Sequence, residues 1–170
     1  MTPFKALSDM RTIGRLLTDA EQVARRMGDE RPSAEHLLLA AMTLPDGTAA
    51  GALQRLGVDA GRLAQAIRDE HAAGLVAAGI DAATAAAMAT DRPVTPTVRS
   101  GVYRSNPSAQ ELFQAAGAAA RSARQRLAGA HVVLAAADLQ HGTLARALDR
   151  LEVDRAALRA AAESQLAAPA

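Results

Sequence analysis

The feature that most constrains the fold of this chain is a long internal duplication. Segments 36–63 and 131–158 align without a gap, and 15 of their 28 positions are identical. Shared alanine content would not by itself align His36 with His131, or the Gly-Thr and Val-Asp pairs that follow each of them. Two copies are too few for an open solenoid. The sequence therefore predicts one compact, double-lobed domain whose halves are related by a pseudo-twofold axis.

Composition predicts that both copies are helical. Of the 170 residues, 49% are hydrophobic but only 2% are aromatic, so the core must consist of Leu, Val, Ile, Met and above all Ala. Alanine is the best helix former, and the sequence has no runs of the β-branched residues that are typical of strands. The expected fold class is all-α, with four helices in each copy.

Helix start and stop signals place the helices of the first copy. Gly28 and Gly57 suit the left-handed position that follows a helix end. Ser33, Thr48 and Asp59 are expected to cap helices by accepting hydrogen bonds from free backbone amides. We therefore expect helices at about residues 9–27, 34–44, 49–56 and 60–71.

The second copy repeats this plan after a longer connector. Asn106 is expected to cap a helix that has Pro107 in its first turn, where a missing N–H costs nothing. Asp154 is expected to cap the last helix. In the connector, Asp81 is expected to cap an extra alanine-rich helix that ends near Thr90. The residues that follow, which include Pro93, Pro96 and Gly101, favour an extended, exposed path.

These signals also predict the boundaries of the domain, the repeats and the connector. A length of 170 residues is that of one domain and can bury a core, so we assign residues 1–170 to a single domain. Within it we place the first repeat at 9–71, the connector at 72–105 and the second repeat at 106–166. A connector of this length is often functional or disordered.

The residue types and spacings that common catalytic sites need are missing. The chain has no cysteine, which excludes disulfides and thiolate chemistry. It has no HExxH motif, no GxSxG elbow and no glycine-rich phosphate loop before its only lysine, Lys5. We predict a protein that is not an enzyme and that has no catalytic residue, no metal and no cofactor. His36 and His131 are interpreted as structural histidines, anchored by hydrogen bonds inside each lobe, with a metal ligand or a general base as the alternative.

Charge and hydropathy limit the partners. The net charge of +1 gives no global attraction to nucleic acid or to anionic lipid. No apolar run approaches the ~18 residues that a membrane span needs. We therefore predict a cytoplasmic protein with neither a nucleic-acid nor a membrane partner. A helical regulator that binds DNA through two recognition helices stays as the alternative function.

The order of motifs in each copy resembles the N-terminal, or Clp repeat, domain of the Clp family of AAA+ unfoldases. In that family a G-T-E-H-[IL]-L-L stretch begins the second helix of each repeat. The first copy here reads Ser-Ala-Glu-His-Leu-Leu-Leu over residues 33–39, and the second reads Gly-Ala-His-Val-Val-Leu over residues 129–134. Each is followed by a Gly-Thr turn and an Ala-Leu-x-Arg-Leu helix. The resemblance covers almost the whole chain apart from the connector and both ends.

The resemblance implies a non-catalytic domain that binds substrates, adaptors or small peptide ligands in regulated proteolysis. It implies Clp protease components, adaptor proteins and client proteins as partners. In some members, the glutamate of the motif helps to hold arginine-phosphorylated substrates. By that resemblance Glu35, with Ser33 and Ala34, is a candidate for binding phosphoarginine or a peptide, and Phe4 is a candidate apolar contact or a core residue. The second copy departs from the family because Ala130 replaces the glutamate.

Overall fold

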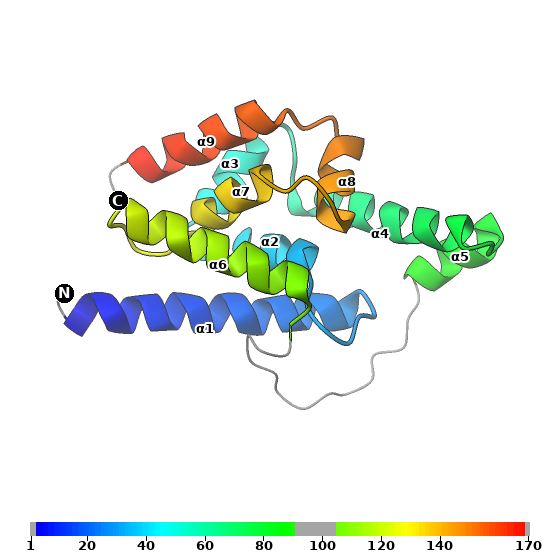
Figure 1. Cartoon of the computed structure of the whole chain (residues 1–170), viewed down its shortest axis with the longest axis horizontal. Helices are drawn as coiled ribbons and strands as arrows, with labels where there is room; N and C mark the ends of the chain where they lie inside the picture. The colour runs from blue at the N-terminus through cyan, green and yellow to red at the C-terminus, as the bar shows by residue number, and fades with distance from the viewer. Residues whose placement is uncertain (1–2, 91–104, 169–170) are drawn as a thin grey trace.

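The computed structural model describes residues 3–90 and 105–168, and the side chains of 10–89 and 105–168. Over these residues the chain forms nine α-helices and no strand, which confirms the predicted all-α class (Figure 1). The helices are α1 (Pro3–Arg26), α2 (Ala34–Ala41), α3 (Thr48–Gln54), α4 (Ala60–Ala77), α5 (Ala82–Thr90), α6 (Pro107–Ser122), α7 (Gly129–Ala137), α8 (Thr143–Arg150) and α9 (Arg155–Ala167).

The last helix of each copy is capped by one aspartate, as expected. Asp59 accepts a hydrogen bond from the amide of Arg62 at 2.8 Å, and Asp154 accepts from the amides of Ala156 and Ala157 at 3.2 Å. The first turn of a helix leaves these amides without partners inside the helix, and such a cap stabilises it by about 1 kcal/mol.

Several helix boundaries differ from the prediction, and α2 ends at Ala41 rather than at residue 44. The first helix already begins at Pro3, because proline suits the first turn of a helix. The fourth runs to Ala77 rather than to residue 71, since Gly74 stays helical and the backbone leaves the helix only before Gly79, whose φ is 94°. Thr48 is the first residue of α3 and not its cap. Its amide and its hydroxyl both donate to Asp46, at 2.9 and 2.6 Å.

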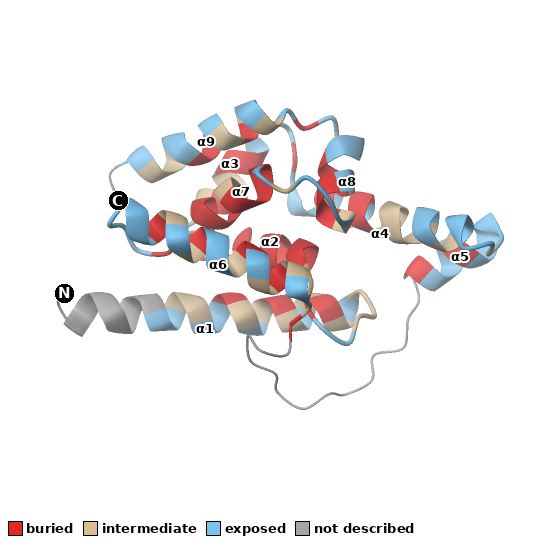
Figure 2. Cartoon of the chain, in the orientation of Figure 1, coloured by how far each residue is buried: buried red, intermediate tan, exposed pale blue. Residues whose placement is uncertain are grey.

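The two copies interlock. The central helices are α2 and α7, and nearly all of their residues are buried (Figure 2). Within each copy the first helix packs along the second, α1 on α2 and α6 on α7. The fourth helix of each copy, however, packs against the third helix of the other copy: α4 on α8, and α9 on α3. The pseudo-symmetry therefore extends to the contacts that join the halves.

The core is built from leucine and alanine, as composition predicted. Most of the largest fully buried side chains are leucines, and they come from both copies. Buried alanines between them allow the helices to approach closely. Replacing one buried leucine by alanine would cost about 2–5 kcal/mol of unfolding free energy.

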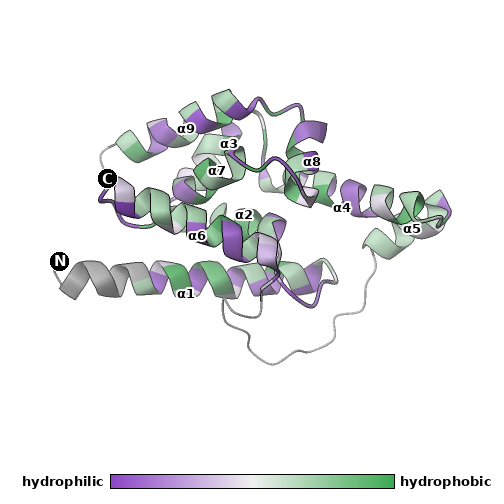
Figure 3. Ribbon diagram, in the orientation of Figure 1, coloured by the Kyte–Doolittle hydropathy of each residue, from purple (hydrophilic) through white to green (hydrophobic). Residues whose placement is uncertain are grey.

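The extra helix predicted in the connector is present. The amide of Thr84 donates to Asp81 at 3.0 Å, which caps α5. Helix α5 packs on α4, and the two form a hairpin that projects from the body (Figure 1). Although α5 is largely hydrophobic, most of it is exposed (Figures 2 and 3). The path predicted through Pro93, Pro96 and Gly101 lies outside the described residues. None of the helices in the described ranges has the length and apolar character needed to cross a membrane.

Candidate functional site

The first turns of α2 and α7 are equivalent in the two copies, and each meets a turn from the other copy. The turn at residues 46–48, which leads into α3, bonds to the start of α7. The equivalent turn at residues 141–143, which leads into α8, lies beside the start of α2. The two junctions are thus related by pseudo-symmetry, and a comparison of them shows where the copies have diverged.

The junction at α7 is closed. Asp46 accepts a hydrogen bond from the amide of Gly129 at 3.2 Å, and Thr48 Oγ1 accepts one from the amide of Ala130 at 2.8 Å. Free amides and the helix dipole favour negative charge at a helix start. The carboxylate of Asp46 therefore occupies the place that a bound anion would take.

The junction at α2 is open. A cavity of about 220 Å³ lies between the start of α2, the turn before α8 and the first turns of α6, and we call it the helix-start cavity. In the repeat alignment His141 replaces Asp46, and Thr143 matches Thr48. His141 and Thr143 both line the cavity. The carboxylate that closes the first junction therefore has no equivalent in this turn.

The start of α6 anchors α2 on the opposite side of this cavity. The amide of Ala34 donates to Ser108 Oγ at 3.3 Å, and the side-chain amide of Asn106 donates to Ser33 Oγ at 2.6 Å. Ser33 is the N-cap residue of α2, but its hydroxyl bonds to the second copy. These contacts fix the first turn of α2 relative to the second repeat.

At two equivalent positions, the residues of the two junctions differ in side-chain size. At the closed junction Gly129 lies against Ala49, so closely that a Cβ at Gly129 would be 2.8 Å from the Ala49 Cβ. At the open junction the corresponding residues are Ala34 and Leu144, and both line the cavity. The closed junction thus has the smaller pair of residues, and the open junction has the larger pair.

Glu35 supplies a carboxylate at the open junction. It lines the helix-start cavity although the residue is only 5% exposed. One of its oxygens lies 3.6 Å from Nε2 of His71 on α4. Its position in the first turn of α2 is favourable for a negative charge. A buried carboxylate at the wall of a cavity can pair bidentately with a guanidinium group.

The two buried histidines make the same hydrogen bond in their copies. Nδ1 of His36 accepts from the amide of Ser33 at 3.0 Å, and Nδ1 of His131 accepts from the amide of Ala128 at 3.1 Å. Each ring thus binds the amide of the residue just before its helix. This geometry fits the predicted structural role, which stays a prediction.

The Nε2 atoms of the two histidine rings have different surroundings. Since Nδ1 accepts, a neutral ring carries its proton on Nε2. Nε2 of His36 lies 3.3 Å from a carboxylate oxygen of Asp29, close but not aligned as a hydrogen bond. Nε2 of His131 is buried without a hydrogen-bond partner among the described residues. Burial lowers the pKa of His131, because a charged ring would lose its hydration.

The structure thus brings together three of the four residues that the resemblance indicated. Ser33, Ala34 and Glu35 all line the helix-start cavity. Phe4 lies in α1, and its side chain is outside the described set. Sequence reasoning missed the contributions of Ser108, Glu111, His141 and Thr143 to the same cavity. Of these, only His141 and Thr143 had a signal, namely their alignment with the first-copy turn.

Metal binding receives no support from the side chains that are described. Over residues 10–89 and 105–168, no group of three or more His, Cys, Asp or Glu side chains could hold a metal ion. The arrangement offers hydrogen-bonding and ionic contacts to a ligand.

Comparison with known families gives a match over the first half of the chain. The family model of the Clp repeat (R) N-terminal domain matches residues 11–94, which include most of α1 and all of α2 to α5. No curated protein sequence matches the chain.

Comparison with solved structures covers both repeats. The chain is similar to the crystal structure of the N-terminal domain of the caseinolytic protease-associated chaperone ClpD from Arabidopsis thaliana. The similarity covers 91% of this chain and 94% of that chain, with 21% sequence identity and a TM-score of 0.56. At this identity the comparison shows the fold, and it confirms the fold that the resemblance implied.

Proposed function

We propose that the chain is a non-catalytic module that binds proteins or peptides in regulated proteolysis, as the match of residues 11–94 to the model of the Clp repeat N-terminal domain supports. Its partners are client proteins, adaptors or components of a Clp protease in the cytoplasm. The family's domain is a non-catalytic module of Clp proteins, which supports the non-catalytic role proposed for this chain.

The observation that carries the proposal is the broken symmetry of the two helix starts. Asp46 occupies the start of α7, whereas the start of α2 opens into the helix-start cavity. The open junction therefore supports a binding role for this side of the molecule.

The proposed ligand is a phosphoarginine side chain on a client. The carboxylate of Glu35 would pair with the guanidinium part, since Arg–carboxylate pairs form two parallel hydrogen bonds. The first turn of α2, with Ser33 and Ala34, would favour the phosphoryl part. In the second copy Ala130 replaces the glutamate and Asp46 fills the junction, so the proposal assigns one site to each chain.

Calorimetry with matched peptides tests this proposal. We expect a peptide that carries one phosphoarginine to bind with a stoichiometry of one, and the same peptide with plain arginine to bind much more weakly. Glu35→Gln keeps the shape of the side chain but removes its charge. It should weaken binding by about 10- to 100-fold, since a hydrogen bond to a charged group contributes about 1.5–3 kcal/mol.

Glu163→Gln is the matched control, because Glu163 is an exposed glutamate on α9, away from the cavity. It should leave the affinity unchanged. Equal affinity for the two peptides, or an undiminished affinity in Glu35→Gln, would refute the phosphoarginine site.

A further inference from the structure

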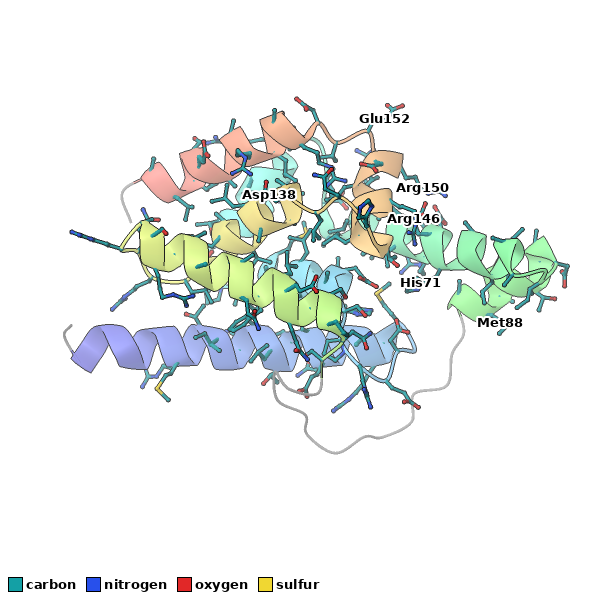
Figure 4. The ribbon with its side chains drawn as sticks, in the orientation of Figure 1. His71, Met88, Asp138, Arg146, Arg150 and Glu152 are labelled. Atoms are coloured by element: carbon teal, nitrogen blue, oxygen red, sulfur yellow. The ribbon has the colours of Figure 1, made fainter. Side chains whose placement is uncertain are left out.

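A second cavity adjoins the candidate site. It has a volume of about 290 Å³ and lies between the end of α1, the α4–α5 hairpin and the first turn of α8. We call it the hairpin cavity. Thr143 lines both cavities, and the contact between Glu35 and His71 joins a wall of the first to a wall of the second. Its lining includes His71 on α4, Met88 on α5 and Arg146 on α8, which Figure 4 labels.

One part of the wall of the hairpin cavity is apolar, and the rest is polar or charged. Its apolar walls are formed by Met27 from the end of α1, Leu75 from α4, and Met88 and Ala89 from α5. Met88 is 41% exposed, so a ligand there would cover apolar surface that now faces water. Methionine side chains are flexible and polarizable, and they adapt to apolar ligands of different shape.

The polar and charged part of its wall consists of Asp29, Glu70, His71, Thr143 and Arg146. Glu70 bonds to Nε of Arg146 at 3.0 Å and to Arg150 at 2.8 Å. His71 contacts Glu35, as described above, and Asp29 contacts the buried His36. Glu70 is thus held by two arginines of α8. The apolar side chains of Met27, Leu75, Met88 and Ala89 give an apolar occupant a surface to cover.

Four of the residues that line this cavity lie outside the two repeats: Gly74, Leu75, Met88 and Ala89. Leu75 belongs to the extension of α4 beyond the predicted residue 71, and Met88 to the extra helix of the connector. The hairpin follows the first copy, so its cavity forms beside the open junction at α2. The connector thus adds a feature to the same face on which the helix-start cavity opens.

We propose that the hairpin cavity is a specificity pocket that holds an apolar side chain of the client peptide, next to the residue bound in the helix-start cavity. This inference rests on the proposed function, and it names the client more closely: a phosphoarginine flanked by a side chain such as leucine. The volume is at the low end for ligand pockets and suits a single side chain.

Three peptides of equal length test the inference: phosphoarginine flanked on both sides by leucine, phosphoarginine flanked by glycine, and plain arginine flanked by leucine. The full chain is labelled with ¹³C in its methionine methyl groups and followed by NMR. Met27 and Met88 report on the hairpin cavity. Met10, exposed on α1, and Met42, in the core, serve as controls within the same molecule.

We expect the leucine-flanked phosphopeptide to bind about tenfold more tightly than the glycine-flanked one, as burial of one aliphatic side chain allows. It should shift the signals of Met27 and Met88 and leave those of Met10 and Met42 in place. Met88→Gln, which removes the apolar surface without adding a charge, should abolish the preference for leucine without weakening the glycine-flanked peptide. Val76→Gln, at another exposed apolar residue of the same hairpin, should keep the preference.

Equal binding of the two phosphopeptides, with Met27 and Met88 unmoved, overturns the inference and leaves the phosphoarginine site intact. A plain-arginine peptide that shifts Met27 and Met88 as strongly as the phosphopeptide also overturns it, because the pocket would then act without the helix-start cavity. Failure of the proposed function itself is recognised separately, since Glu35→Gln would then change none of the affinities.

Discussion

A Cβ atom at Gly129 would stand 2.8 Å from the Cβ of Ala49, and it would also approach the carbonyl oxygen of Ala41 to 3.1 Å. These two neighbours come from the first copy, whereas Gly129 begins α7 of the second. The closed junction between the repeats therefore depends on the absence of one side chain.

Gly129→Ala should destabilise the chain by about 1–3 kcal/mol, the usual cost of overpacking a core. The neighbours are a buried alanine and backbone atoms, which cannot move aside as a flexible side chain would. Urea denaturation followed by circular dichroism measures the change. Gly14→Ala is the control: nothing lies within 4 Å of its Cβ position, so it should stabilise α1 by about 0.5–1 kcal/mol. Equal effects of the two substitutions would contradict the close approach.

Glu152→Gly should stabilise the chain by about 0.5–1 kcal/mol, because Glu152 has a φ of 55°, in the region that glycine tolerates best. Its counterpart after the third helix of the first copy is Gly57, with a φ of 71°. Gly57→Ala should therefore be destabilising. Thermal unfolding of both variants measures the two changes, and a lower melting temperature for Glu152→Gly would show that the left-handed backbone is not strained.

Acid should weaken the fold partly through His131. Burial lowers the pKa of His131 in the folded state, so the unfolded chain takes up a proton on this residue first as the pH falls. The free energy of unfolding is therefore unaffected by this residue above its pKa in the unfolded chain, which is about 6.5. It decreases as the pH falls from there toward the lowered pKa of the folded state, by at most about 1.4 kcal/mol per pH unit. The unfolding free energy of His131→Gln, measured between pH 8 and 5, should show a shallower slope than that of the unmodified chain. Identical slopes would refute the contribution of this group.

His141→Asp should close the open junction. The substitution gives the turn before α8 the carboxylate that Asp46 provides at α7, and this carboxylate would compete with the phosphoryl group for the start of α2. We expect phosphoarginine peptides to lose about tenfold or more in affinity, the effect of one hydrogen bond to a charged group. His141→Asn, which has the same shape without the charge, is the control and should lose much less. Calorimetry gives both affinities, and an equal loss in the two variants would exclude a charge effect.

Much of the fold was predictable from local signals. The aspartates at 59, 81 and 154 cap helices because a side-chain oxygen at that position satisfies free amides, whatever the rest of the chain does. The duplication predicted that both copies fold alike, and the matching bonds of His36 and His131 agree. The end of α4 was misplaced because no local signal marks residue 71 as a boundary.

The candidate site was predictable only in part. Glu35 could be identified because the family motif marks its position, and the loss of its counterpart at Ala130 was visible in the sequence. The open and closed junctions could not be distinguished in advance. They depend on pairs such as Gly129 with Ala49, which are distant in sequence and meet only because the copies interlock.

The packing of each fourth helix on the third helix of the other repeat has a consequence for the origin of the chain. A solitary unit would leave the surfaces of its third and fourth helices without their partners, so an ancestor of half the length would have needed to dimerise with itself. In such a homodimer both helix starts must be identical, and any substitution that seals one seals the other. Gene fusion removes that constraint, and it allows one junction to become a structural joint while the other stays available for recognition.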